Sequence, residues 1–516
     1  VRSAKIRANP ECEFVDNETI SADDAPLPLA GRTARADMNH PSIRLYIDGA
    51  FVDGRGALRL EVRNPADGAL LTDYAAADDA DLRAAVAAAA RGFAVWSRKL
   101  ALERFRIITA ATALIRERAA AIARILTLEQ GKPLAEALRE VQLSADIIDF
   151  LAEEAKRLAA RGVPPRTAGV LSQTVQRVPI GPVAAFTPWN FPANLPARKI
   201  GGALAAGCSL ILEPDEQVPG TCLEFVRAFH DAGLPPGVLN VVLGHPPHIS
   251  STLIAEPAIA KISFTGSVPV GKQLGELAAR HMKRYTAELG GHAPVVVCAD
   301  ADAQAVARLA VVAKFRNAGQ VCASPVRLLV QRARLDAFRD AFVAGTQALK
   351  VGDGLAEGSN FGPLVNERRL ALMQQLVDDA LACGGRLLCG GRRIERPGWF
   401  YAPTVIEGAP ERARLQSEEP FGPIALLDAF DDLDEAIARA NALPYGLAAY
   451  AFTRDLATAH RLGQELQAGM VGINHFGVSQ PETPFGGVKE SGIGHESGLE
   501  GLLGCTELKL VSVAAP

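Results

Sequence analysis

From Gly181 onward, short apolar segments alternate with longer helical ones, and this alternation restricts the fold more than any other feature of the chain. Helical segments lie between most of the expected strands, which are 183–187, 209–212, 238–242, 261–264 and 295–298. Such alternation is typical of a parallel sheet whose strands are joined by crossover helices. A second α/β region follows, with strands expected near 326–330, 424–427, 449–452 and 472–474. We therefore predict an α/β fold.

The segment before Gly181 is mainly helical. An alternating stretch around Asp48-Gly49 predicts a β-hairpin at 45–52. Helical periodicity then extends over 79–99, 101–130 and 133–159. Two prolines interrupt this pattern between 162 and 172. The alternation at 173–178 predicts a strand that leaves the core.

A chain of 516 residues is long for one core and predicts two or three domains. The net charge is -4 and basic residues form no long run, so we expect neither nucleic acid nor membrane as a partner.

The eight cysteines form no CxxC pair and the histidines no HExxH pair, so we predict no metal site and no disulfide framework. Scattered cysteines suit a reducing compartment, and we expect a cytoplasmic protein. Residues 1–37 lack the apolar core of a signal peptide, and we interpret them as a disordered tail or as sequence upstream of the natural start.

A candidate nucleophile, Cys322, lies in a loop of small residues from Gly319 to Pro325, between an amphipathic segment and an apolar one. Loops between a helix and a strand commonly display reactive groups. Ala323 and Ser324 follow the cysteine, so no bulky neighbour in the sequence shields its sulfur. A buried cysteine that behaves as a small apolar residue is the more common situation, and we assign it to the other seven cysteines.

Four other stretches carry the partners that a thiolate nucleophile needs. The stretch Phe264-Thr265-Gly266-Ser267 ends an expected strand, where glycine and a helix N-terminus favour phosphate. Pro188-Trp189-Asn190 is a rigid turn that can hold the Asn190 amide as a donor. Glu288 stands beside two glycines and could act as a base on water. Glu419 lies in a turn with two prolines. Taken one at a time, the glycine turn and the two glutamates are more typical of plain turns and solvated carboxylates.

Together and in this order, these stretches resemble the aldehyde dehydrogenase superfamily, most closely the succinate-semialdehyde dehydrogenases. The resemblance covers residues 40–516 and rests on the motifs Pro188-Trp189-Asn190, Phe264-Thr265-Gly266-Ser267, Glu288-Leu289-Gly290-Gly291, Gly319-Gln320-Val321-Cys322, Glu419-Pro420-Phe421-Gly422-Pro423 and Pro484-Phe485-Gly486-Gly487. It implies a Rossmann-like cofactor domain, a catalytic α/β domain and a small oligomerisation β-element. The corresponding segments are 38–158 with 182–288 for the cofactor, 289–490 for catalysis, and 159–181 with 491–516 for oligomerisation. We accordingly expect a homodimer or homotetramer.

The resemblance also implies a mechanism. Cys322 would attack the aldehyde carbonyl as a thiolate, and the Asn190 amide and the Cys322 backbone N–H would hold the oxyanion. Hydride transfer to the nicotinamide would leave a thioester, which water activated by Glu288 would hydrolyse. Members that transfer the acyl group to coenzyme A often lack this glutamate, so Glu288 favours a free acid as product. Lys199 and Glu496 resemble the proton-relay pair of the family.

The cofactor-binding residues that the resemblance implies are Thr187, Pro188, Trp189, Glu213, Glu216, Gly244, Phe264, Thr265, Gly266, Ser267, Leu289, Glu419 and Phe421. Among them, Glu419 would hold the nicotinamide ribose. Glu213 departs from the family pattern, which has a lysine beside the adenosine ribose. A carboxylate accepts hydrogen bonds from ribose hydroxyls and repels a 2′-phosphate. We therefore predict that NAD is preferred over NADP.

Three positions match the carboxylate-binding residues of succinate-semialdehyde dehydrogenases: Arg198, Arg316 and Ser479. Two guanidinium groups at one pocket suit an anionic substrate, because unpaired buried charge is costly. The alternative is that one or both arginines are surface charges. We predict oxidation of a small aldehyde with a distal carboxylate, with succinate semialdehyde favoured. Glutarate semialdehyde and 2-oxoglutarate semialdehyde would suit the same residues, and a non-catalytic binding or structural member of the family is a third interpretation.

Overall fold

The first of two large sheets has eight strands in the spatial order β19-β11-β10-β7-β8-β9-β1-β2 in the computed structural model, which describes residues 40–515. Its strands are β1 (Leu45–Ile47), β2 (Ala50–Val52), β7 (Val183–Thr187), β8 (Leu210–Pro214), β9 (Leu239–Val241), β10 (Lys261–Gly266), β11 (Arg284–Leu289) and β19 (Gly492–Ile493). The five central strands, from β11 to β9, are parallel, as the alternation predicts. Asp48 and Gly49, with φ of 52° and 82°, join β1 to β2 in the predicted hairpin. The predicted tail 1–37 lies outside the described residues.

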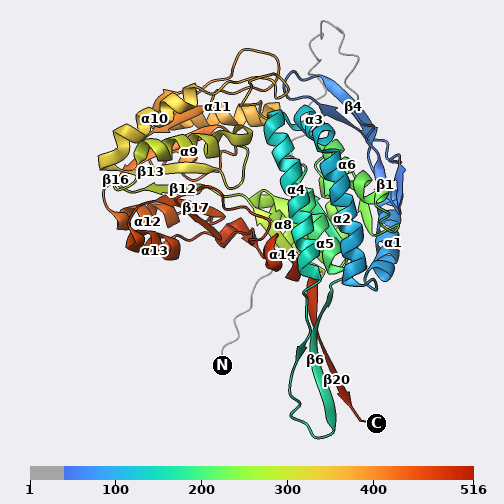
Figure 1. Cartoon of the computed structure of the whole chain (residues 1–516). Coiled ribbons are helices and arrows are strands. Elements are labelled where there is room, and N and C mark those ends of the chain that lie inside the picture. The colour runs from blue at the N-terminus through green and yellow to red at the C-terminus, as the bar shows by residue number, and fades with distance from the viewer. Residues whose placement is uncertain (1–39, 516) are drawn as a thin grey trace, which may run out of the picture. The chain divides into compact units, whose positions relative to one another are not determined.

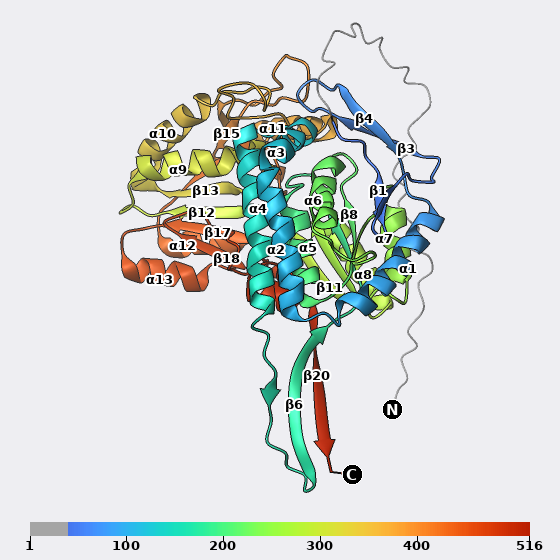
Figure 2. The same cartoon turned by 45° about the vertical axis from the view of Figure 1, so that its right-hand side comes forward.

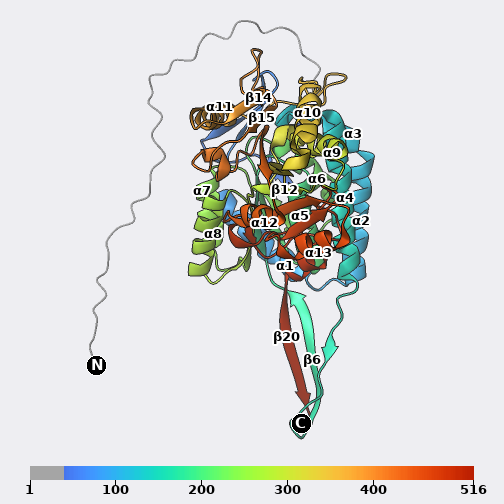
Figure 3. The ribbon, with the colours of Figure 1, turned by 90° about the vertical axis from the view of Figure 1, so that its left-hand side faces the viewer.

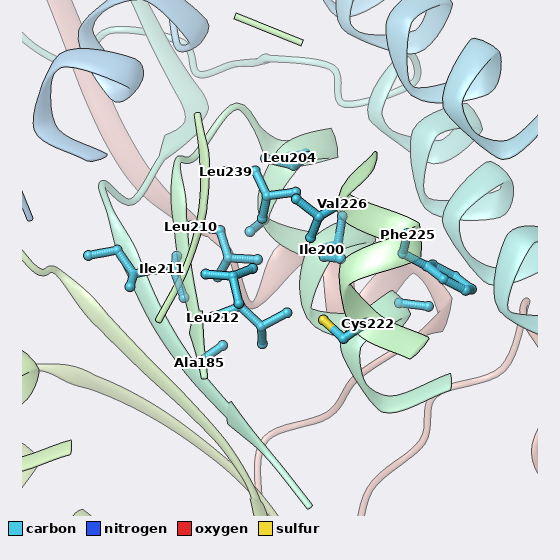
Figure 4. Close-up of a cluster of buried hydrophobic side chains, with 14 of the residues drawn as sticks. Ala185, Ile200, Leu204, Leu210, Ile211, Leu212, Cys222, Phe225, Val226 and Leu239 are labelled. Carbon is cyan, nitrogen blue, oxygen red and sulfur yellow. The ribbon is translucent and has the colours of Figure 1, made fainter. Parts of the chain in front are cut away.

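Helices cover both faces of this sheet (Figure 2). One face carries α1 (Asp79–Trp96), α7 (Pro246–Ala255) and α8 (Val268–Arg280), and the other carries α5 (Asn194–Ala206) with α6 (Pro219–Asp231). An outer layer packs against α5 and α6 and consists of α2 (Ala101–Glu117), α3 (Ala119–Gln130) and α4 (Leu134–Ala155). Figure 4 shows the core between them, where Leu210 and Leu212 of β8 face Ile200 of α5 and Phe225 of α6. This apolar packing holds the strands in place, and the carboxyl ends of the strands are not part of it.

The second large sheet has seven strands in the order β14-β15-β16-β13-β12-β17-β18. Its strands are β12 (Ala293–Val297), β13 (Pro325–Gln331), β14 (Arg386–Cys389), β15 (Thr404–Glu407), β16 (Ile424–Phe430), β17 (Ala448–Phe452) and β18 (Met470–Ile473). All are parallel except the edge strand β14. Its helices lie above and below in Figure 1 and are α9 (Ala303–Phe315), α10 (Leu335–Gln347) and α11 (Glu367–Ala382) on one face, and α12 (Leu433–Asn441) and α13 (Leu456–Glu465) on the other.

Two smaller sheets complete the described chain. β3 (Arg59–Arg63) pairs with β4 (Leu70–Ala75), and β6 (Val170–Pro179) lies between β5 (Arg161–Gly162) and β20 (Thr506–Ala514). The long strands β6 and β20 run side by side and antiparallel, as Figure 1 and Figure 3 both show. The predicted segment 491–516 is divided, because β19 pairs with β11 and α14 (Gly498–Leu503) packs against α4 and α5, whereas β20 joins β6. Oligomerisation through β6 and β20, and the predicted domain roles, remain predictions.

The structure differs from the sequence expectations in two places. The expected helical run 101–130 is two helices, because Arg118 leaves helical geometry (φ −92°, ψ 5°) and pairs with Asp231 at the end of α6 (2.7 Å). Glu288, which taken alone is more typical of a solvated carboxylate, is buried inside strand β11. Within residues 40–515, no helix combines the length and apolar character that a membrane span requires.

The two large sheets meet end to end at the chain segment that joins them. β11 leads through Gly290, Gly291 and His292 into β12. Asn190, which follows β7, donates its Nδ2 to the carbonyl O of Gln320, which precedes β13 (3.1 Å). The carboxyl ends of the parallel strands in the first sheet therefore face loops that precede strands of the second sheet. Ligands of open α/β sheets bind outside the carboxyl ends of strands, so this junction is the expected place for a site.

Candidate active site

Cys322 follows a tight turn made by three consecutive residues with left-handed backbone. Asn317, Ala318 and Gly319 of the 3-10 segment η1 (Arg316–Gly319) have φ of 50°, 53° and 72°. A Cβ at position 319 would lie 2.2 Å from the carbonyl O of Gly422, so only glycine fits there. Left-handed backbone is unfavourable for the other two residues and persists where surrounding contacts fix it, which is typical of functional sites.

Hydrogen bonds fix this loop on both sides of the cysteine. The Gln320 side chain donates to the Asn317 carbonyl (3.1 Å) and accepts from the Val365 N–H (3.0 Å). The Tyr450 hydroxyl donates to the carbonyl of Ala323 (2.8 Å). These hydrogen bonds therefore hold the loop around Cys322 in one conformation.

The Cys322 thiol lines a cavity of about 120 Å³ together with Phe191, Arg198, Arg316 and Ser479. Burial, with smaller contributions from the carboxyl groups of Glu419 and Glu288, raises the pKa of this thiol to about 12, and Arg198 opposes the shift. The thiol is consequently protonated at neutral pH in the free protein. A base or a positive charge from a ligand is needed to form the thiolate.

Asn190 lies against the nucleophile loop in the turn after β7. Besides the bond from its Nδ2 to Gln320, its carbonyl O accepts from the Lys132 Nζ (2.9 Å) and from the Asn317 Nδ2 (2.8 Å). An amide nitrogen carries two hydrogens, so one N–H of the Asn190 side chain remains free for another acceptor. The Asn190 side chain thus contacts the loop two residues before Cys322, and its role as an oxyanion donor stays a prediction.

Glu288 is buried in β11 next to Thr265 of β10, and neither of its carboxyl oxygens has a hydrogen-bond partner among the described residues. Burial and the nearby Glu496 raise the pKa of Glu288 well above its usual value. A buried carboxyl group without partners is costly unless a ligand or water completes its hydrogen bonds. A carboxyl group whose pKa is raised toward neutrality is suited to accept and release protons.

Lys199 and Glu496, predicted from distant parts of the chain, form a buried ion pair. Ser263 joins both, because it accepts from the Lys199 Nζ (3.1 Å) and donates to the Glu496 Oε1 (3.2 Å). Burial lowers the pKa of Lys199, and the charge of Glu496 opposes this shift. Since Glu496 also raises the pKa of Glu288, the three ionisable groups are electrostatically linked.

The predicted cofactor residues at the carboxyl ends of β7, β8 and β10 include buried polar atoms that have no hydrogen-bond partner within residues 40–515. These atoms are Thr187 Oγ1, Glu213 Oε1 and Thr265 Oγ1. A Cβ at Gly266 would lie 2.3 Å from the Phe264 ring, so the backbone there is open only because it is glycine. Ser267 begins α8 without capping the helix with its side chain, which leaves helix N–H groups for a ligand. These features fit a dinucleotide with its phosphates at α8.

Three carboxyl groups gather at the carboxyl end of β8: Glu213 lies within the strand, and Asp215 and Glu216 follow it. Burial raises the pKa of Glu213 well above its usual value and that of Asp215 to about 7, and Glu216 adds to both shifts. The Glu216 carbonyl O accepts from the Tyr74 hydroxyl (3.0 Å). The predicted Gly244 lies after β9, where a Cβ would meet Ile249 at 3.1 Å.

Glu419 lies in the turn before β16 of the second sheet, and its side chain reaches the junction between the two sheets. Its Oε1 accepts from the Gly291 N–H (3.2 Å), and burial raises its pKa to about 7. Phe421 has φ of 45° and meets Trp189 edge to face at 5.5 Å between ring centroids. These contacts join the turn after β7 to the turn before β16, so the predicted cofactor residues of both sheets share one junction. Pro188 lies in the first of these turns, and Leu289 ends β11.

The predicted carboxylate-binding residues line the Cys322 cavity, but the two arginines differ. Arg198 is 3% exposed and donates to Asn194 (3.0 Å), to Ser479 (2.9 Å) and to Ser497. Arg316 is exposed and lies over the Phe191 ring, 5.6 Å from its centroid. Among residues 40–515, neither guanidinium has a carboxylate within ion-pair distance.

Three features of the site have no counterpart in the sequence expectations. A buried ion pair joins Lys132 to Glu140, which also accepts from the N–H groups of Ala193 and Asn194 at the start of α5. Lys314 is buried, donates to Ser324 (3.2 Å), and has its pKa lowered to about 7 by burial. Arg139 also lines the cavity. The α4 residues of the cavity could have been found from the sequence by their helical spacing, because positions 136, 139, 140 and 143 share one helix face.

Comparisons with known proteins agree with this geometry. The model of the aldehyde dehydrogenase family matches residues 51–511. A 4-(hydroxymethyl)benzenesulfonate dehydrogenase of Comamonas testosteroni is 46% identical over 471 residues, which are 91% of this chain and 98% of that protein. The NADP-dependent succinate-semialdehyde dehydrogenase of Escherichia coli is 40% identical, over 90% of this chain and 97% of its own. The crystal structure of a succinate-semialdehyde dehydrogenase from Burkholderia pseudomallei superimposes with a TM-score of 0.90 at 39% identity, over 93% of this chain and 99% of that one. The predicted fold is thereby confirmed.

Proposed function

The chain belongs to the aldehyde dehydrogenase family, and from this premise we propose that it oxidises an aldehyde with a distal anionic group, most readily succinate semialdehyde to succinate, with NAD. The observation that carries the proposal is Arg198. Its guanidinium is buried in the Cys322 cavity, and among residues 40–515 its hydrogen bonds go only to neutral side-chain oxygens. A buried positive charge without a counter-ion favours an anionic ligand, since the ligand supplies the missing charge.

Cys322 is the nucleophile of the proposed reaction. It loses its proton and forms a thiohemiacetal with the aldehyde carbon, and the free N–H of Asn190 with the Cys322 backbone N–H holds the oxyanion. One such donor contributes about 3–4 kcal/mol to barrier lowering in other enzymes. A dinucleotide held here would supply the hydride acceptor for the oxidation. Thr187, Thr265 and the N-terminus of α8 would hold it, with Glu419 at its ribose.

Glu288 is the proposed base that activates water for thioester hydrolysis. Its raised pKa means that it takes up the proton of water readily. Ser263 bonds Lys199 and Glu496, and this group would pass the proton onward from Glu288. Retention of this carboxyl group supports a free acid as product and disfavours a non-catalytic role for the chain.

The preference for NAD rests on the carboxyl groups at the carboxyl end of β8. Asp215 and Glu216 stand with Glu213 where the family has a lysine, and negative charge there disfavours a 2′-phosphate. The related enzyme of Escherichia coli is named for NADP, so this residue difference is the basis of the proposal.

A distal sulfonate is the second candidate for the anionic group. Relatives of this chain are named for 4-(hydroxymethyl)benzenesulfonate and 3-sulfolactaldehyde, as well as for succinate and glutarate semialdehydes. Each of these names contains an acid group that is anionic at neutral pH. The exposed position of Arg316 at the cavity would allow a head group larger than a carboxylate.

A panel of aldehydes with NAD and NADP tests the proposal. Succinate, glutarate and 2-oxoglutarate semialdehydes are compared with hexanal, and kcat/KM is measured for each. We expect every semialdehyde to exceed hexanal and NAD to exceed NADP. A preference for hexanal, or an unchanged KM for succinate semialdehyde in Arg198→Ala, would refute the anionic substrate.

A further inference from the structure

Arg139 lines the same cavity as Cys322 and is not used by the proposed function. It lies on α4, on the helix face that also presents Glu136, Glu140 and Leu143 to the cavity. This set has the spacing i, i+3, i+4 and i+7, which places all four on one side of a helix. Arg139 therefore faces the cavity because of the helical register.

The guanidinium of Arg139 is free to bind a ligand. Within the described chain, no hydrogen bond and no ion pair within 4.0 Å involves it. Lys132 is paired with Glu140, which leaves Arg139, Arg198 and Arg316 against the single carboxylate of Glu136. The Asn317 N–H already donates to Glu136 (2.9 Å). Among the residues that line the cavity, positive charges therefore exceed negative ones by two, although Glu496 and Glu288 also act on Arg198 from outside this lining.

The three arginines lie at two depths. Arg198 is 3% exposed and close enough to Cys322 to lower the pKa of its thiol, whereas Arg139 and Arg316 are exposed. Apolar side chains line the same cavity, among them Phe191, Leu143 and Phe485. An anion at Arg198 therefore lies near the nucleophile, and an anion at the outer pair lies farther along an apolar wall.

We propose that Arg139 and Arg316 form an outer anion subsite, distinct from the inner one at Arg198, and that it recognises aromatic aldehydes with an anionic group opposite the aldehyde. In such a substrate the aldehyde lies at Cys322, the ring contacts the apolar wall, and the outer guanidiniums bind a carboxylate or sulfonate. This inference rests on the proposed oxidation of aldehydes at Cys322. It makes Arg139 a specificity-determining residue that separates long anionic substrates from short ones.

The test compares Arg139→Ala with the unchanged protein on four aldehydes: succinate semialdehyde, 4-formylbenzoate, 4-formylbenzenesulfonate and benzaldehyde. We expect the KM of both anionic aromatic aldehydes to rise about ten-fold, because a charge-assisted hydrogen bond is lost. The KM of succinate semialdehyde and of benzaldehyde should change less than about two-fold by the same reasoning. Arg139→Lys keeps the charge and should recover part of the loss.

Arg83→Ala is the matched control, since Arg83 is an exposed arginine of α1 outside the cavity. Equal changes for all four aldehydes, or no change for the anionic aromatic pair, would overturn the outer subsite. A rise for only one of the pair would identify carboxylate or sulfonate as the preferred head group. If the unchanged protein prefers benzaldehyde to all three anionic aldehydes, the proposed function itself fails, whatever Arg139→Ala does.

Discussion

The carboxyl group of Glu419 lies so close to Gly290 that a Cβ at position 290 would stand 2.1 Å from its Oε2. The same carboxyl group accepts a hydrogen bond from Gly291. Two successive glycines thus let a side chain of the second sheet reach the end of β11. Glu419, the proposed ribose-binding residue, can therefore occupy this position only because residue 290 has no side chain.

The change Gly290→Ala should displace Glu419 without unfolding the protein. The clashing atoms are the far end of a flexible side chain, which can move at low cost in stability. We expect the KM for NAD to rise about ten-fold, the loss of one hydrogen bond to a charged group. Gly463→Ala is the control, because nothing lies within 4 Å of a Cβ at that helical position. An unchanged KM for NAD would contradict the role of Glu419.

Removal of one partner from the buried Lys199 and Glu496 pair should destabilise the protein. Lys199→Met leaves Glu496 buried without its counter-ion, and we expect the free energy of unfolding to fall by about 3–5 kcal/mol. The double change Lys199→Met with Glu496→Leu should recover part of this loss, because no unpaired charge remains. Urea denaturation measures both. If the double variant lost as much unfolding free energy as the two single variants together, Lys199 and Glu496 would not be energetically coupled.

The reactivity of Cys322 should rise with pH over a wide range. A thiol whose pKa is raised to about 12 is almost fully protonated at pH 7, and its thiolate fraction grows about ten-fold per pH unit below that pKa. Alkylation of Cys322 by iodoacetamide, followed by peptide mass spectrometry from pH 7 to 9, measures this slope. Glu419→Gln removes a negative charge that raises the pKa and should speed alkylation at pH 9. A plateau near pH 7 would contradict the protonated resting state.

Discrimination between NAD and NADP should increase with pH. The pKa of Asp215 is raised to about 7, so this group is neutral below that pH and charged above it. Its charge repels a 2′-phosphate, and we expect the ratio of kcat/KM for NAD over NADP to rise roughly ten-fold from pH 6 to pH 8. Asp215→Asn keeps an acceptor for Gln217 and should flatten this dependence. A ratio that falls with pH would refute the electrostatic explanation.

The sequence predicted the elements that local pattern determines. The strand expected at 183–187 is β7, and the parallel order of β11, β10, β7 and β8 explains why Thr187, Thr265 and Glu288 meet at one edge. The amphipathic segment before the nucleophile is α9. Parallel strands share one carboxyl edge, so motifs at their ends are neighbours whatever their distance in the chain.

Some contacts between distant segments had no signal in the sequence. Arg198 donates to Ser497, 299 residues away, which was not predicted, whereas its bond to Ser479, 281 residues away, joins two residues that the family resemblance had already grouped. Arg118, between α2 and α3, pairs with Asp231 of another helix. The left-handed backbone of Ala318 also has no local signature, because alanine rarely adopts it and tertiary packing imposes it here.

The three-residue connection between β11 and β12 links chemistry to the arrangement of the sheets. Glu288 lies in β11 directly before its end at Leu289, and Cys322 precedes a strand of the second sheet, so the proposed base and nucleophile have separate supports. A rotation of one sheet against the other would change the separation of base and nucleophile while leaving each core intact. Substitutions at the junction that contact neither Glu288 nor Cys322 would therefore slow hydrolysis of the thioester more than they slow its formation.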